Sequence, residues 1–301
     1  MLEKLVEIIE EQLNVEGVEI TEKTDFQNDL EADSLDLFEL SMAIEEAFEV
    51  EIPSEELSQF TTVGSVIEYL KANGMELPGL VAGSDVKIAP IVSSKRALQV
   101  ILRYWKKHYD RKPDLVVIEG PKAGGHLGFS GEELEKYETE NYDSVIEEIL
   151  TLTKPEGIPV VVAGGVYTRQ DMEHCLALGA DGVQLATRFV TTYECDAHPA
   201  YKQAYIDAKP EDIVIVKSPV GMPGRAIRND FLEQVEQGNR FMKGCRKCIT
   251  TCDPKTVPYC ITQALINAVE GRVEEGLLFC GSNAYLATKL EHVQEIMEEF
   301  S

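Results

Sequence analysis

The sequence predicts a multidomain fold, in which an all-α bundle of four helices precedes an α/β region of about four strand-helix units. The first observation is size, because 301 residues with 44% apolar content suffice for two domains. The second is charge, since residues 1–74 carry a net charge of −17 and residues 75–301 carry −8. The third is a change of pattern, from helical apolar spacing to short runs rich in Val and Ile.

The first domain, residues 1–74, is expected to contain four helices. Apolar residues at helical spacing mark helices within 2–13, 37–48 and 63–70. Thr61 and Thr62 cap the last of these. The "SEEL" segment after Pro53 fits a short fourth helix, and the stop signals Asn73 and Gly74 close the bundle.

The second domain, residues 86–301, follows a linker at 75–85 that is rich in turn-forming residues. Four short runs in it are apolar on both faces and alternate with helix-compatible segments, namely "VKIAPIV", "PDLVVIEG", "IPVVVAGG" and "DGVQLAT". This alternation is typical of parallel strands in an α/β fold. Beyond residue 200, "SPVGMPGRAIRND" is expected to be a loop, and helices are expected around 264–269 and 292–300.

A serine begins the second helix in the acidic stretch "DLEADSLDLFEL". Asp33 is a strong helix N-cap, so the hydroxyl of Ser34 is not needed for capping. Acidic side chains, including Asp36 and Glu39, are expected on the exposed side of this helix. The pattern therefore favours a functional serine beside an acidic surface over a simple cap.

Residues 1–74, with the motif Asp33-Ser34-Leu35, resemble an acyl carrier protein. The resemblance implies that a phosphopantetheinyl transferase attaches 4'-phosphopantetheine to Ser34. A phosphodiester suits a helix N-terminus, where backbone N–H groups are unpaired. The acidic helix would then dock basic patches on enzymes of fatty acid synthesis.

Turns of small residues follow three of the predicted strands: "VVIEGPKAGGHLGF" and "VVVAGGV" each contain a glycine pair, and "VQLATRF" has Ala186 and Thr187 in the corresponding place. Paired glycines let a backbone approach a ligand closely, and turns after late strands of a barrel commonly bind phosphate. With "DAHPAYKQ" and "GRAIRN", this series resembles the nitronate monooxygenase family, whose relatives include the flavin-dependent enoyl-acyl-carrier-protein reductase II. The resemblance runs from about residue 86 to the C-terminus.

That resemblance implies FMN on a (βα)8 barrel of the TIM type, with NAD(P)H as a candidate reductant. It places His126 at the flavin as the acid/base residue, acting on a nitronate or on an enoyl thioester, and imidazole suits this work because its pKa is near neutral. Ala186 stands where the family usually has Gly. The residues implied to contact FMN are Gly120, Gly125, Gly165, Gln184, Leu185, Ala186 and Thr187.

Four strand-helix units correspond to only the second half of such a barrel, so the expected α/β domain is incomplete. Its two edge strands would expose unpaired backbone groups, so another polypeptide segment has to pair with them. Three alternatives are open: a second copy of the chain completes the barrel as a homodimer, a second polypeptide completes it, or nothing does and the half-barrel stays open. The first two favour an oxidoreductase fused to a carrier, and the third favours a working carrier with an inactive remnant.

A cysteine cluster, C-x2-C-x3-C-x7-C, comprises Cys245, Cys248, Cys252 and Cys260. Thiolates at this spacing can hold zinc or an iron-sulfur cluster, but the gaps match neither common zinc ribbons nor ferredoxins. Reduced structural thiols without metal are therefore expected.

Composition also excludes several partners and locations. A net charge of −25 disfavours nucleic acid and anionic membranes as partners. The acidic, amphipathic start differs from a secretory signal, and no apolar run approaches the roughly 18 residues of a membrane span. We therefore expect a cytoplasmic protein.

Overall fold

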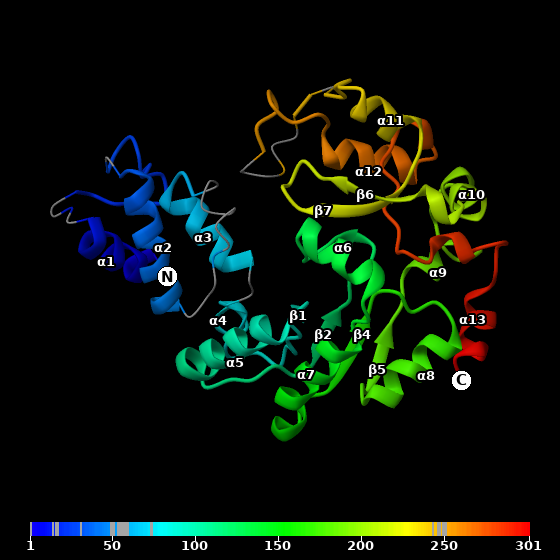
Figure 1. Cartoon of the computed structure of the whole chain (residues 1–301), viewed down its shortest axis with the longest axis horizontal. Coiled ribbons are helices and arrows are strands. Elements are labelled where there is room, and N and C mark those ends of the chain that lie inside the picture. Colours follow the sequence, from blue (N-terminus) through cyan, green and yellow to red (C-terminus); the bar gives the residue numbers. More distant parts are fainter. Residues whose placement is uncertain are drawn as a thin grey trace. The chain divides into compact units, whose positions relative to one another are not determined.

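The computed structural model describes residues 2–13, 15, 18–30, 32–48, 52, 60–72, 75–242, 244–245, 248 and 252–301 (Figure 1). The chain divides into two compact units. Unit 1 comprises Met1–Pro90 and Arg96–Asp114, and unit 2 comprises Ile91–Lys95 and Leu115–Ser301.

Unit 1 confirms the three long helices expected near the N-terminus. These are α1 (Leu2–Leu13), α2 (Ser34–Phe48) and α3 (Val63–Ala72). Their apolar stripes form one core, in which Leu5, Leu40 and Leu70 are at most 1% exposed. The fourth helix expected after Pro53, and the stop signals at 73–74, lie outside the described residues.

Unit 1 also contains α4 (Leu77–Leu80) and α5 (Lys95–Tyr109). The short helix α4 lies in the segment that was expected to be a linker. Helix α5 is strongly amphipathic, and it buries Leu98, Ile101 and Trp105 within the residues described.

Unit 2 is built on a four-stranded parallel sheet, which confirms the α/β prediction. The strands are β1 (Ile91–Val92), β2 (Val116–Glu119), β4 (Val160–Ala163) and β5 (Gly182–Gln184), in the order β1-β2-β4-β5. Residues 116–118 of β2 are fully buried, as expected for a strand covered on both faces. Among the described strands, β1 and β5 are the sheet edges.

Helices connect the parallel strands. After β2 come α6 (Gly131–Thr139) and α7 (Asp143–Thr153), and α8 (Arg169–Leu178) lies between β4 and β5. Helix α7 packs against β4 and α8 against β5 (Figure 1). Because successive strands are parallel, the turns after β2, β4 and β5 all lie at the carboxyl ends of the strands, on one side of the sheet.

A second sheet corrects the sequence prediction. Strands β3 (Gly125–His126), β7 (Pro223–Ile227) and β6 (Ile213–Lys217) form an antiparallel sheet in the order β3-β7-β6. The segment expected to be a loop therefore contributes the whole of β7. Gly224 is required there because a Cβ would lie 2.8 Å from a ring carbon of Phe279.

Five further helices complete the described part of unit 2. They are α9 (Thr187–Val190), α10 (Pro199–Asp207), α11 (Asp230–Glu236), α12 (Ile261–Val269) and α13 (Val293–Glu299). Helices α12 and α13 confirm the two helices expected beyond residue 260. Short 3-10 segments lie at Lys154–Glu156, Pro210–Asp212, Val273–Glu275 and Ala284–Leu286.

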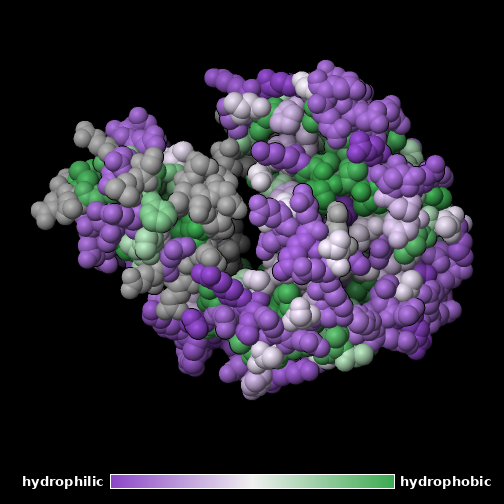
Figure 2. All heavy atoms as spheres, in the orientation of Figure 1, coloured by the Kyte–Doolittle hydropathy of each residue, from purple (hydrophilic) through white to green (hydrophobic). Residues whose placement is uncertain are grey.

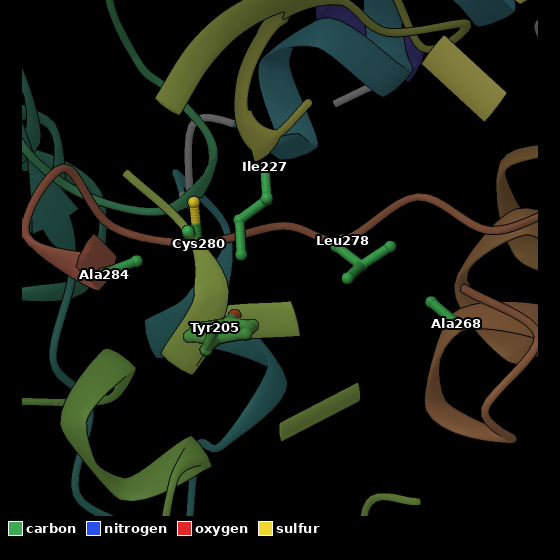
Figure 3. Close-up of a cluster of buried hydrophobic side chains, with 7 residues drawn as sticks. Tyr205, Ile227, Ala268, Leu278, Cys280 and Ala284 are labelled. Atoms are coloured by element: carbon green, nitrogen blue, oxygen red, sulfur yellow. The ribbon is translucent and has the colours of Figure 1, made fainter. Parts of the chain in front are cut away.

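A buried cluster joins α10, β7 and α12 to the segment that precedes α13 (Figure 3). Its labelled members are Tyr205, Ile227, Ala268, Leu278, Cys280 and Ala284. Figure 2 shows mainly hydrophilic side chains on the visible face of unit 2, with apolar side chains near β6 and α12. None of the helices within the described ranges is long and apolar enough to span a membrane.

Candidate functional site

The start of helix α2 has the geometry that the sequence predicted. Asp33 caps it, because the Asp36 N–H donates to Asp33 Oδ1 at 3.0 Å and the Leu37 N–H donates to the Asp33 carbonyl at 3.1 Å. Asp36 Oδ2 accepts the Asp33 N–H at 2.8 Å in return. Ser34 is therefore the first residue of a helix whose cap is already supplied by its neighbour.

Two large apolar side chains of α2 are exposed, Phe38 at 49% and Met42 at 54%. They follow Ser34 at intervals of four residues, and positions four apart lie on one face of a helix. The exposed carboxylate Glu39 lies on the same helix. The described surface of α2 thus combines apolar and acidic groups beside the serine.

A cavity of about 270 Å³ lies at the carboxyl ends of β2, β4 and β5 in unit 2. Most residues of the predicted flavin site line it, namely Gly125, Gly165, Gln184, Leu185, Ala186 and Thr187. Gly120 lies instead on a neighbouring cavity of about 710 Å³, whose wall includes Asp143 and His174. The structure therefore brings the turns after β2, β4 and β5 to one place.

Two glycines in this cavity cannot be replaced without strain. Gly164 and Gly165 both have φ of +87°, a conformation that side chains rarely adopt. A Cβ on Gly164 would lie 2.8 Å from the Ala123 nitrogen, and one on Gly165 would lie 2.9 Å from Lys122 Cβ. The turn after β4 therefore packs closely against the turn after β2, and both turns line the cavity.

The charges in the cavity wall are those of Glu119 and Lys122. Burial raises the pKa of Glu119, and an N–H donated by Gly128 partly opposes this rise. The Lys122 side chain runs along Gly165. A cationic side chain beside exposed backbone is a suitable environment for an anion such as a phosphate.

A segment near the C-terminus forms part of the site, and the sequence interpretation missed it. The Gly281 N–H donates to Thr187 Oγ1 at 2.9 Å, and Asn283 Nδ2 donates to the Gly165 carbonyl at 2.7 Å. The Ser282 N–H donates to the Lys122 carbonyl at 3.1 Å. The turn-forming letters "CGSN" after an apolar run are the sequence signal for it.

His126 lies beside this cavity rather than in its wall. It follows Gly125 on β3, and its half-buried ring packs edge-to-face on Phe279 with the centroids 4.9 Å apart. Gly125 and Phe279 both line the cavity. Burial lowers the pKa of His126, so its imidazole is neutral near pH 7.

Within the described part of the chain, the cysteines form no disulfide bond. Cys280 lines the cavity, and burial raises the pKa of its thiol to about 12. Among the predicted cluster, Cys248 Sγ lies 3.1 Å from Thr262 Oγ1, and Cys260 occupies the N-cap position of α12 without a capping bond from its side chain. The absence of metal from this cluster remains a prediction.

Comparisons with known proteins match both parts of the chain. Residues 76–301 match the nitronate monooxygenase family model, and residues 3–70 match the phosphopantetheine attachment site model. A probable nitronate monooxygenase of Staphylococcus haemolyticus is 30% identical over 192 residues, which is 62% of this chain and 49% of the relative. One of Staphylococcus aureus is 29% identical over 173 residues, which is 58% of this chain and 43% of the relative.

Solved structures share the fold. FabK from Thermotoga maritima has a TM-score of 0.57 at 24% identity, covering 88% of this chain and 80% of that one. A nitroalkane oxidase from Streptomyces ansochromogenes has a TM-score of 0.54 at 19% identity, covering 88% and 74%. The chain spans about half the length of the curated relatives it matches.

Proposed function

Because residues 76–301 make this chain a member of the nitronate monooxygenase family, we propose that it combines an acyl carrier domain with an FMN-dependent oxidoreductase segment. One observation carries this proposal. The three turns that follow β2, β4 and β5, with Gly125, Gly165 and Ala186, meet at a single cavity beside His126. The proposed domains are residues 1–74, the linker 75–85, and residues 86–301.

The residues around the cavity fit FMN. Gly164 and Gly165 line the cavity, and Lys122 supplies a positive charge in the same wall. A volume of about 270 Å³ is near the lower end for small-molecule sites, so the described walls suit the phosphate end of the cofactor. Bound FMN would supply the electron transfer that the protein side chains do not provide.

His126 would exchange the proton in this reaction. A neutral imidazole removes a proton from the carbon next to a nitro group, and its protonated form delivers one to the carbon next to a thioester carbonyl. The lowered pKa of His126 favours the neutral form at pH 7. The two candidate substrates are an enoyl chain on a carrier, with NAD(P)H as reductant, and a nitronate or its parent nitroalkane.

The carrier domain would present the acyl chain. Ser34 would hold 4'-phosphopantetheine, and the exposed Phe38 and Met42 would contact the transferase and the enzymes of fatty acid synthesis. Tethering a substrate raises its local concentration. We also propose that a second copy, or a second polypeptide, pairs with the edge strands β1 and β5 to complete the barrel.

Titration with FMN tests the flavin proposal. Wild type should acquire the visible absorption of bound flavin, and Gly165→Ala should bind FMN at least about tenfold more weakly because its Cβ meets Lys122. Gly157→Ala is the matched control, since Gly157 has φ of +63° but open space around its Cβ. A wild type that takes up no FMN would leave only the carrier function.

Replacing His126 tests the acid/base role. His126→Gln should retain FMN and lose at least about a hundredfold in turnover, because general acid-base catalysis contributes roughly this much or more. Stopped-flow assays with a neutral nitroalkane and with an enoyl thioester would distinguish the two substrate classes. Unchanged turnover of both substrates in His126→Gln would refute the assignment of His126.

A further inference from the structure

Ser218 is a buried polar residue whose hydroxyl meets the imidazole of His126. Ser218 Oγ lies 2.7 Å from His126 Nε2, and the residue is 3% exposed. These two residues are 92 positions apart in sequence. The contact therefore depends on the antiparallel sheet that the sequence did not predict.

The turn between β6 and β7 fixes Ser218. The Gly221 N–H donates to the Ser218 carbonyl at 3.0 Å, and the Ser218 N–H donates to the Met222 carbonyl at 3.1 Å. His126 is fixed from the other side, because it pairs with Gly224 of β7 and its ring packs on Phe279. Both partners of the 2.7 Å contact are thus held by the same sheet.

The direction of this hydrogen bond decides which nitrogen can act as a base. If the Ser218 hydroxyl donated to Nε2, a neutral imidazole would carry its proton on Nδ1, and neither nitrogen would have a free lone pair. If Nε2–H donates to Ser218 Oγ, the lone pair of Nδ1 remains available. The Val220 N–H also donates to Ser218 Oγ, at 3.4 Å, and a hydroxyl oxygen has two lone pairs for these two donors.

We propose that Ser218 is a positioning residue, which accepts the Nε2–H of His126 and leaves Nδ1 as the atom that exchanges a proton with the substrate. The part of this inference that concerns substrate rests on the proposed function. The hydrogen bond itself concerns only residues of this chain. No charged group contributes to the lowered pKa of His126, whose cause is burial.

Nitrogen NMR of the histidine side chains tests the inference without cofactor. The protein has five histidines, and His126→Gln identifies the signal of His126. Wild type should show the neutral tautomer with the proton on Nε2. Ser218→Ala should give mixed tautomers and a lower pKa for His126, because a hydroxyl acceptor stabilises the imidazolium more than the neutral ring. Ser218→Thr, which retains a hydroxyl, should restore the wild-type tautomer.

Ser130→Ala is the control for loss of a hydroxyl. Ser130 caps α6 by accepting the Glu133 N–H at 3.2 Å, so its removal costs about 1 kcal/mol of stability. It should leave the tautomer of His126 unchanged. In turnover assays, Ser218→Ala should lower kcat about tenfold or more with little change in KM, while Ser130→Ala retains wild-type kcat.

The outcomes separate this inference from the proposed function. A wild-type tautomer with the proton on Nδ1, or an unchanged tautomer and pKa in Ser218→Ala, would overturn the role of Ser218 even in an active enzyme. An Nε2–H tautomer that depends on Ser218, in a protein that binds no FMN, would support the positioning and reject the flavin proposal.

Discussion

Ser34→Ala is expected to abolish attachment of the phosphopantetheine arm. The arm is joined through a serine oxygen, so alanine removes the only atom that can form the phosphodiester at this position. Helix α2 should still form, because Asp33 rather than Ser34 accepts the N–H of Asp36. The measurement is the intact mass after incubation with coenzyme A and a phosphopantetheinyl transferase.

Two controls make this result specific to Ser34. Ser84→Ala removes an exposed hydroxyl that bonds the Val81 carbonyl, and it should leave modification complete. Asp33→Ala keeps the Ser34 hydroxyl but loses the cap of α2, so modification should slow while its final extent is retained. A Ser34→Ala protein that still gains the mass of the arm would show that another residue carries it.

The parallel sheet was predictable because its signal is local. Residues 116–118 and 160–163 are apolar on both faces, and a run of this kind has few alternatives to a buried strand. The N-cap at Asp33 and the glycine turns were predictable for the same reason. Backbone conformations such as the φ of +87° at Gly165 restrict the residue type at a single position.

The antiparallel sheet and the C-terminal part of the site depend on distant contacts. Strand β7 contains Gly224, a poor strand former, which is kept there because Phe279 packs against it. Asn283 reaches the Gly165 carbonyl across 118 positions of sequence. No local pattern encodes such pairings, so Ser218 could not be linked to His126 before the sheet was known.

Arg188, in α9, binds the C-terminal end of unit 2 and the turn that precedes α8. Its side chain is 8% exposed and lies 3.3 Å from Glu291 Oε1 and 2.6 Å from Glu299 Oε2. Nη1 also donates to the Tyr167 carbonyl at 3.0 Å. This guanidinium therefore ties α9, whose first residue is Thr187 in the cavity wall, to α13.

Arg188→Ala is expected to lower the free energy of unfolding of unit 2 by about 1–3 kcal/mol, because it removes a buried guanidinium and leaves the half-buried Glu291 carboxylate and the Tyr167 carbonyl without this partner. Hydrogen exchange of unit 2 peptides in urea is the suitable measurement, since the one tryptophan, Trp105, lies in unit 1. Lys136→Ala breaks an exposed pair with Glu140 and should cost less than about 1 kcal/mol. Equal losses in the two variants would contradict the role of Arg188.

The same ion pairs predict how the stability of unit 2 depends on pH. The hydrogen bond from Arg188 lowers the pKa of Glu299 in the folded protein. A lowered carboxyl pKa stabilises the folded state above the pKa of the unfolded chain, and this stabilisation is lost as pH falls through the folded pKa. Wild-type unit 2 should therefore lose stability in acid more steeply than Arg188→Ala. If the unfolding free energies of the two proteins changed with pH in the same way, Arg188 would not be the cause of the lowered pKa of Glu299.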